Sequence, residues 1–383
     1  MDFELNDDQR QLKEAIAGFL AGEFPFERLK TLKRSGKAHD ERLWRGLVEL
    51  GVPALLVPTG AGGLGYGPIE TYALMEAAGP HLLLEPVFAS AVLATLVLEK
   101  LGGAGERLLG ELARGARIAT LAHFERDSRF ELEPVATRAE REGSAWRLDG
   151  QKSLVLQAGL ADVLLVSARL GAAGSGAGGL ALFEVPRTQP GVRLREYALV
   201  DGQRAAEVGL EAVSVPAAAC IATGEPVPRA LELAVAEASA ALGAEAVAIM
   251  QAVLGATIEY LRTRQQFGQP IGRFQALQHR VADMRVQLEQ ARSMSLLAAL
   301  RCRSDDTAER RRAVSGAKAL IGEASRFIGQ QAIQLHGGMG MTDELQVSHW
   351  FKRLTAIDLW FGDSDTHLER YLVLMREEVS SDV

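Results

Sequence analysis

The segment RTRQQFGQPIGRFQALQHRVADM, residues 262–284, separates two long helical patterns in the second half of the chain. Before it, residues 228–261 are rich in alanine and leucine, with no proline after Pro228. After it, Val281, Met284, Leu288 and Ala291 recur on one helical face, and a further amphipathic pattern covers residues 308–335. We therefore predict a bundle of long helices around this segment.

Toward the N-terminus of this segment, the sequence pattern changes near residue 115. Between there and about residue 220 it offers short β-type runs, including AWRL, ADVLLVSARL, LALFEV and EVGLEAVSV, with a turn signal at Asp149-Gly150. Before residue 115 the pattern is helical again, beginning with a helix that Asn6 can cap and that stops before Pro25. The expected order is all-α, then a compact β region, then all-α.

Composition excludes several classes of function. The formal charge of −7 argues against nucleic acid or an anionic membrane as the main partner. Two cysteines fit a reducing cytosol, and no export signal or membrane span is expected. The seven histidines show no pair at the short spacings of a metal site, so we expect a cytoplasmic protein without a catalytic metal.

One glycine motif has the spacing of a dinucleotide loop. GAGGLG, residues 60–65, matches G-x-G-x-x-G, which would suit a nicotinamide enzyme if it opened a βαβ unit. It instead follows helical sequence and a run that Pro53 and Pro58 interrupt. A glycine turn between helices is the favoured interpretation.

Two other segments suit a flavin nucleotide. Arg264 could bind a pyrophosphate through its guanidinium, and Phe267 could cover a flat ring. Gly337 and Gly338, in QLHGGMGMTDE, could bring bare backbone close to a ligand. A solvated helix end and a simple helix stop are the alternatives for these two segments.

Together with ELGVPALLVPTGAGGLGYGPIET and QLHGGMGMTDELQVSHWFKR, these motifs resemble the acyl-CoA dehydrogenase family over nearly the whole chain. The resemblance implies an α+β multidomain fold: an N-terminal helical domain over 1–114, a middle β-barrel over 115–222 and a C-terminal four-helix bundle over 223–383. It also implies FAD, an acyl-CoA thioester substrate and an electron-transfer flavoprotein as oxidant.

The resemblance also assigns individual residues. It implies that a neighbouring subunit's FAD is contacted by Arg264, Gln266 and Phe267 and by Gln334, Gly337 and Gly338. In LWFGDSDTHLERY, residues 359–371, aligning backward from Arg370 makes Asp363 the catalytic base and Asp365 and His367 flavin contacts. A carboxylate suits this role because the reaction removes a proton beside the thioester.

Alternatives for the base remain open. Counting forward from Arg353 places the base position at Gly362, one residue earlier. Some family members hold the base in the first helix of the C-terminal bundle, where Glu245 and Glu237 are the nearby carboxylates. A residue of a partner subunit is the remaining possibility.

Two middle segments depart from the family pattern, namely ATLAHFERDSRFELEPVATR and KSLVLQAG. Both would line the flavin in typical members. These departures resemble the small subunits of two-component enzymes that act on pimeloyl-CoA or steroid side chains. They imply a bulky or dicarboxylic acyl-CoA and a homotetramer, or a heterotetramer with a second acyl-CoA dehydrogenase-like subunit. A non-catalytic partner that completes another subunit's flavin site is the alternative function.

Overall fold

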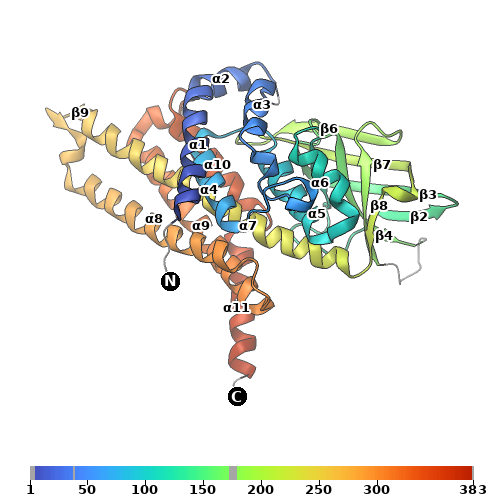
Figure 1. The fold of residues 1–383 in the computed structure, drawn as a ribbon. Coiled ribbons are helices and arrows are strands. Elements are labelled where there is room, and N and C mark those ends of the chain that lie inside the picture. Colours follow the sequence, from blue (N-terminus) through green and yellow to red (C-terminus); the bar gives the residue numbers. More distant parts are fainter. Residues whose placement is uncertain (1–4, 38, 172–178, 382–383) are drawn as a thin grey trace. The chain divides into compact units, whose positions relative to one another are not determined.

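The computed structural model describes residues 5–37, 39–171 and 179–381 as a mixed α+β protein (Figure 1). The chain forms two compact units. The helical unit combines Met1–Lys30, Pro68–Leu83 and Ser239–Val383, and the sheet unit combines Thr31–Gly67 and Leu84–Ala238. The boundaries expected at residues 114 and 222 stay a prediction.

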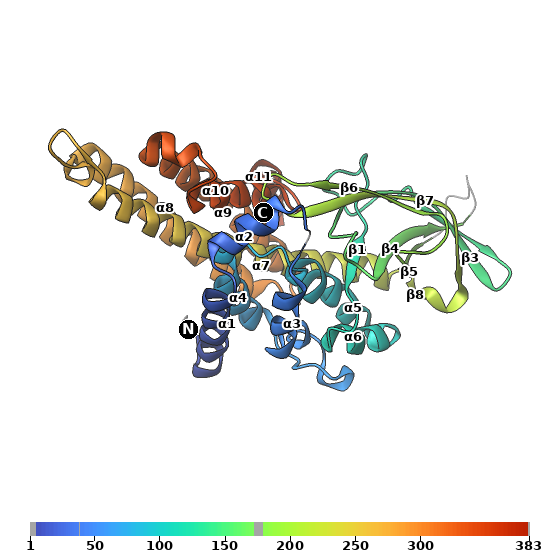
Figure 2. The same ribbon diagram turned by 90° about the horizontal axis from the view of Figure 1, so that it is seen from above.

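The helical unit is built around α9, which packs against α8, α10 and α11. Figures 1 and 2 show α8, α9 and α10 side by side. The predicted seam is largely confirmed, because Met284, Leu288 and Ala291 are fully buried on α8. The helices of this unit are α1 (Asp7–Glu23), α4 (Pro68–Ala78), the second part of α7 (Pro226–Thr263), α8 (Gln275–Arg301), α9 (Thr307–His336), α10 (Gln346–Leu359) and α11 (Ser364–Ser381).

Polar caps start several of these helices, including α1 and α9. The predicted cap at Asn6 is confirmed as a reciprocal pair, in which its side chain accepts from the Gln9 backbone and Gln9 bonds back. Asp306 caps α9 by accepting from the backbone N–H groups of Ala308 and Glu309. Both caps satisfy donors that the first turn of a helix leaves unpaired.

The sheet unit contains one eight-stranded mixed sheet in the order β6-β7-β3-β2-β4-β5-β8, with β1 paired to β4. Its strands are β1 (Ala119–Ala122), β2 (Arg138–Glu142), β3 (Ala145–Leu156), β4 (Val163–Leu170), β5 (Leu180–Pro186), β6 (Val192–Ala198), β7 (Arg204–Pro216) and β8 (Cys220–Thr223). Strand β1 lies parallel to β4, and β2 meets β4 over two parallel pairs. All other strand pairs in this sheet are antiparallel.

The predicted barrel is not confirmed, since the strands described do not pair β6 with β8 to close the sheet. The end strands explain this in part. Strand β6 exposes Arg193, Arg195 and Glu196, and charged side chains along an edge strand discourage further pairing. Strand β8 has only four residues. The middle region is therefore a β domain built on one mixed sheet.

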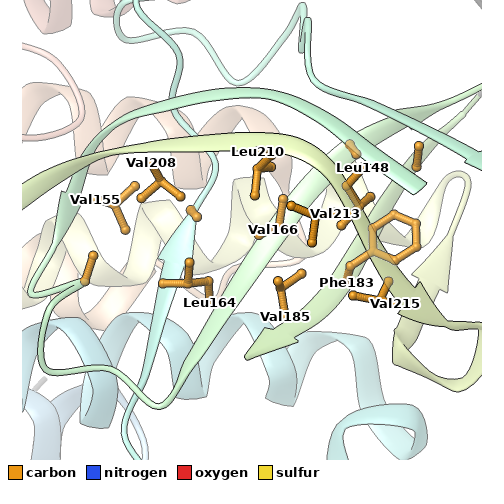
Figure 3. Close-up of a cluster of buried hydrophobic side chains, with 14 of the residues drawn as sticks. Leu148, Val155, Leu164, Val166, Phe183, Val185, Val208, Leu210, Val213 and Val215 are labelled. Atoms are coloured by element: carbon orange, nitrogen blue, oxygen red, sulfur yellow. The ribbon is translucent and has the colours of Figure 1, made fainter. Parts of the chain in front are cut away.

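One face of this sheet holds a dense apolar core (Figure 3). Figure 3 shows Leu164, Val166, Phe183 and Val208 pointing into a common interior from β4, β5 and β7. All four are fully buried. Burying such side chains supplies the main favourable term in folding, and it fixes which face of each strand points inward.

Helices of the sheet unit include α3 (Glu41–Glu49), α5 (Thr95–Leu101), α6 (Glu106–Ala113) and a buried π-helix, η4 (Val87–Ala94). The GAGGLG motif belongs to this unit; its first two residues end a short 3-10 helix, Thr59–Ala61, and the rest form a turn. A Cβ at Gly63 would overlap Val57, which explains the glycine there. The motif does not follow a strand, so the turn interpretation is confirmed over the dinucleotide loop.

Two helical stretches, Val87–Ala113 and Pro226–Thr263, are long and apolar enough to cross a membrane by composition alone. Of their most apolar windows, 61% and 72% respectively are buried inside the fold. Buried core helices of this length have the same composition, so these stretches are weak evidence for a membrane span.

Candidate active site

The turn between α10 and α11 has an unusual backbone. Phe361 has φ +63° and Gly362 has φ +121°, and both Trp360 and Phe361 are buried. A left-handed conformation is costly for a residue with a bulky side chain. Such strained residues persist only where their surroundings hold them, and they cluster at functional sites. This backbone conformation therefore makes the turn next to Asp363 a candidate functional site.

Gly362 lies against the ring of His367. A Cβ placed on Gly362 would lie 3.0 Å from both Cδ2 and Nε2 of that ring and 3.3 Å from Nη1 of Arg370. A side chain at position 362 would therefore displace the ring. Asp363 is the carboxylate that this turn provides.

Asp363 is half-buried and caps α11. Its Oδ1 accepts a hydrogen bond of 2.9 Å from the Thr366 backbone N–H, and its carbonyl accepts from the His367 backbone at 3.0 Å. Its carboxylate therefore lies at the positive end of the helix dipole. The cap also fixes the direction of the side chain. The acidic residues of Asp-Ser-Asp, directly after a glycine, could have revealed this cap from the sequence.

His367 is buried next to this carboxylate. Its Nδ1 lies 3.3 Å from Ser315 Oγ, and its Nε2 has no hydrogen-bond partner among the residues described. Burial, followed by the charges of Lys318 and Arg370, lowers the pKa of His367 to about 3. The ring is therefore neutral at physiological pH, with one nitrogen left for a ligand. Asp365 lies exposed on the first turn of α11.

The predicted arginine and phenylalanine lie elsewhere in the helical unit, on a short hairpin. Strands β9 (Gln265–Gln266) and β10 (Gln269–Pro270) form this hairpin after α7. Phe267 occupies its tip with φ +54° and is 88% exposed. Arg264 and Gln266 are also exposed. An aromatic side chain held in the solvent is available to a partner or a ligand.

The glycine segment meets the same end of the bundle. Gly337, with φ +59°, ends α9, so the helix-stop interpretation is confirmed. Among the residues that the structure describes, no atom lies within 4 Å of a Cβ placed on Gly337 or Gly338, so their backbone is open to a ligand as well. Gln334 is exposed one turn earlier. His336 stacks on Tyr260 at 4.5 Å between ring centres, which ties this segment to the end of α7.

These residues form two groups rather than one site. His367 contacts Ser315 near the start of α9, whereas Gly337 follows the end of α9 at His336. The 21 positions from Ser315 to His336 span roughly 30 Å at 1.5 Å per residue. Figure 1 shows β9 at one end of the α7–α8 pair and α11 near the other. This distance is about the diameter of a small domain, so the two groups lie at different ends of α9.

The residues described fit FAD at both groups. The hairpin and the glycine segment offer Arg264 for a pyrophosphate, exposed Phe267 for a ring and open backbone at Gly337. The turn before α11 offers the unpartnered Nε2 of His367. Each group thus has hydrogen-bonding atoms that no other described residue is shown to use.

Both alternative carboxylates are already paired. Glu245 is buried and accepts two hydrogen bonds from Arg353, at 2.6 Å and 2.8 Å. Glu237 is buried and lies 3.2 Å from Lys100 Nζ in the sheet unit. The sequence could not reveal either pair, because Glu245 and Arg353 are 108 positions apart. Each of these carboxylates therefore has a basic partner in this structure, and which carboxylate is the base stays a prediction.

The two segments of the sheet unit that depart from the family pattern meet in a buried polar network. The sequence did not predict this network. Lys152 Nζ donates to Glu125 Oε1 at 2.7 Å, to Ser167 Oγ at 3.1 Å and to the His123 carbonyl at 3.1 Å. Glu125 also accepts from Thr137. Burial lowers the pKa of Lys152 to about 8. Burial would raise the pKa of Glu125, but Lys152 and Thr137 outweigh it and hold that pKa below its usual value.

Within the described residues, no cluster of three histidine, cysteine, aspartate or glutamate side chains could hold a metal ion.

The sequence of this chain matches models of one protein family. Models of the acyl-CoA dehydrogenase N-terminal, middle and C-terminal domains match residues 6–115, 120–213 and 229–372. The chain belongs to the acyl-CoA dehydrogenase family, whose members are FAD-dependent oxidoreductases acting on CH–CH bonds.

Individual relatives extend over the whole chain. Benzylmalonyl-CoA dehydrogenase of Aromatoleum aromaticum is 30% identical, covering 100% of both chains. Mitochondrial isovaleryl-CoA dehydrogenase of Pongo abelii is 28% identical, covering 97% of this chain and 89% of the relative. The ChsE4-ChsE5 complex of Mycobacterium tuberculosis has a chain with 26% identity and a TM-score of 0.87, covering 98% and 99%. A steroid enzyme of this family, Tcur3481-Tcur3483, has 28% identity and a TM-score of 0.85, covering 98% and 99%.

Proposed function

We propose that this chain uses FAD to introduce an α,β double bond into a bulky or dicarboxylic acyl-CoA thioester, with an electron-transfer flavoprotein as the electron acceptor. The substrate class is supported by the relatives. Benzylmalonyl-CoA carries an aromatic ring and a second carboxyl group, and one of the similar solved structures is a steroid enzyme.

Asp363 is the proposed base. Its half-buried carboxylate at the strained turn is the observation that carries this assignment. In the reaction it would take the proton from the carbon beside the thioester, while bound FAD supplies the hydride acceptor. Aspartate is one methylene shorter than glutamate, so the turn must bring the backbone closer to the substrate. Buried Trp360 and Phe361 would keep water away from that carbon.

The proposed flavin contacts fall into the two groups of residues near the two ends of α9. Asp365 and His367 would meet the flavin used by Asp363. The second group, namely Arg264, Gln266, Phe267, Gln334, Gly337 and Gly338, would meet the flavin of a neighbouring subunit. This arrangement requires at least a dimer, and we propose a homo- or heterotetramer. The paired components named for two similar structures support a second acyl-CoA dehydrogenase-like subunit.

The cytoplasm is the proposed location, and we keep the three-domain division at residues 1–114, 115–222 and 223–383. The alternative of a non-catalytic partner subunit is less well supported, because relatives that match over nearly their whole length are named as dehydrogenases.

The function can be tested on the purified chain, alone and co-expressed with a related second subunit. The proposal predicts a flavin absorbance spectrum that bleaches when a bulky acyl-CoA is added without oxygen. Absence of bleaching in both preparations, with flavin present and a panel of bulky and dicarboxylic thioesters supplied, would contradict it.

A further inference from the structure

One face of α9 holds the turn that ends in Asp363. Lys318, Gly322 and Arg326 are spaced four residues apart, so they lie on one face of this helix. All three approach the segment from Ile357 to Ser364, and we call them the α9 clamp. The turn itself is strained at Phe361, so its geometry depends on what surrounds it.

Lys318 closes the end of α10. Its buried Nζ donates to the carbonyl of Ile357 at 2.8 Å and to that of Asp358 at 3.1 Å. The last carbonyls of a helix have no partner within the helix, and a cation there also opposes the negative end of the helix dipole. A fully buried ammonium group is costly unless it is well bonded, so this residue is held in one position.

Gly322 allows the two ends of the turn to meet. A Cβ at this position would overlap Asp358 Oδ1 and Ser364 Oγ. Ser364 Oγ donates to Asp358 Oδ1 at 2.6 Å, and Arg326 Nη2 donates to Asp358 Oδ2 at 3.2 Å. Asp358 lies in the last turn of α10, and Ser364 is the first residue of α11. The clamp therefore fixes both sides of the residue pair Phe361-Gly362.

We propose that the α9 clamp, with Lys318 as its central member, positions the Asp363 carboxylate for proton abstraction. This inference rests on the proposed role of Asp363 as the base. Lys318 bonds backbone carbonyls rather than substrate, so it is a positioning residue. Its loss would leave the carboxylate present but displaced, and a displacement of about 1 Å in a catalytic group can cost roughly 100-fold in rate.

Lys318→Met tests this role because it keeps much of the side-chain volume and removes both hydrogen bonds. We expect kcat to fall about 10- to 100-fold with little change in KM or in bound FAD. The kinetic isotope effect for a substrate deuterated at the α-carbon should increase, since proton abstraction becomes slower. Lys352→Met is the control, because Lys352 lies half-buried on α10 and bonds the side chain of Asp343, away from the turn. It should keep wild-type kcat.

Gly322→Ala provides a second test that removes no charge. If Lys318→Met does not fold, this variant tests the role of the α9 clamp by itself. Its methyl group would push Asp358 and Ser364 apart, and the same loss in kcat with a larger isotope effect is expected. Unchanged kcat and isotope effect in the folded variants would overturn the proposal.

Asp363→Asn separates this inference from the proposed function. If Asp363→Asn retains turnover, both the base assignment and the clamp's role fall. If it loses turnover while Lys318→Met and Gly322→Ala do not, only the clamp's role falls. Combining Lys318→Met with Asp363→Asn should add no further loss, because both changes act through one carboxylate. A full additional loss in the double variant would overturn the proposal.

Discussion

Glu245 and Arg353 form a buried ion pair with two hydrogen bonds between α7 and α10, of 2.6 Å and 2.8 Å. Both side chains are less than a tenth exposed. Removing one partner of such a pair leaves a buried charge without compensation, which is strongly destabilising. The pair therefore indicates a structural role for Glu245 rather than catalysis.

We predict that Glu245→Ala lowers the free energy of unfolding by about 3–5 kcal/mol. Per molecule of folded enzyme, kcat should stay within about threefold of wild type, since no catalytic proton transfer is lost. Denaturant unfolding and turnover per bound flavin measure the two effects. Unchanged stability with abolished turnover would instead make Glu245 the base.

The buried carboxyl group of Glu85 should make the free energy of unfolding depend on pH. It is buried, its Oε1 accepts from the Asp40 backbone N–H at 3.1 Å, and its Oε2 has no partner among the described residues. Burial raises its pKa from 4.5 to about 7. Between these two pH values the folded chain keeps a proton that the unfolded chain releases. Stability should therefore fall, by up to about 3 kcal/mol, as pH rises through this window.

Glu85→Gln should remove this contribution, because an amide does not titrate. Comparing unfolding at pH 5 and pH 8 for the wild type and this variant measures the difference. An equal pH dependence in both proteins would show that Glu85 is ionised in the fold throughout this range.

The buried network of Lys152 and Glu125 predicts non-additive stability. Lys152→Met alone should cost about 3–5 kcal/mol, because it leaves Glu125 charged in the interior. Adding Glu125→Gln should recover part of that loss, since it removes the unpaired charge. A double-mutant cycle from unfolding curves gives the coupling free energy. A coupling near zero would mean that the two residues do not interact energetically.

Substitutions in the exposed hairpin should weaken cofactor binding without unfolding the protein. Arg264→Ala and Phe267→Ala should weaken FAD retention about tenfold or more each, since charged and aromatic contacts of this kind contribute at least 1 to 2 kcal/mol. The melting temperature of the FAD-free protein should not change. The exposed Arg285, which pairs with Glu289 on α8, gives a matched arginine-to-alanine control. FAD retention equal to wild type in both hairpin variants would remove them from the flavin site.

Local sequence patterns predicted much of the helical unit. The cap at Asn6 and the seam of Met284, Leu288 and Ala291 are set by spacing within one helix, which a sequence displays directly. The turn at GAGGLG was likewise predictable from its flanking prolines. The β region was recognisable from its short runs, but closure of the sheet depends on pairing between strands far apart in the chain, and that expectation was not confirmed.

The site was less predictable because its contacts are long-range. The Glu245–Arg353 pair and the approach of Lys318 to Ile357 join residues on different helices, and no local spacing encodes them. The network around Lys152 required the sheet to bring β3, β4 and the segment after β1 together. Resemblance to the family supplied the candidate residues, whereas the strain at Phe361 became visible only in the backbone geometry.

Asp363→Asn is the most direct measurement of the central claim. An amide in place of the carboxylate keeps the size of the side chain and its cap to Thr366, but it cannot accept the substrate proton. With FAD bound, the rate of flavin reduction by a bulky acyl-CoA should fall by roughly 10²- to 10⁴-fold. Flavin reduction at the wild-type rate in this variant would contradict the account.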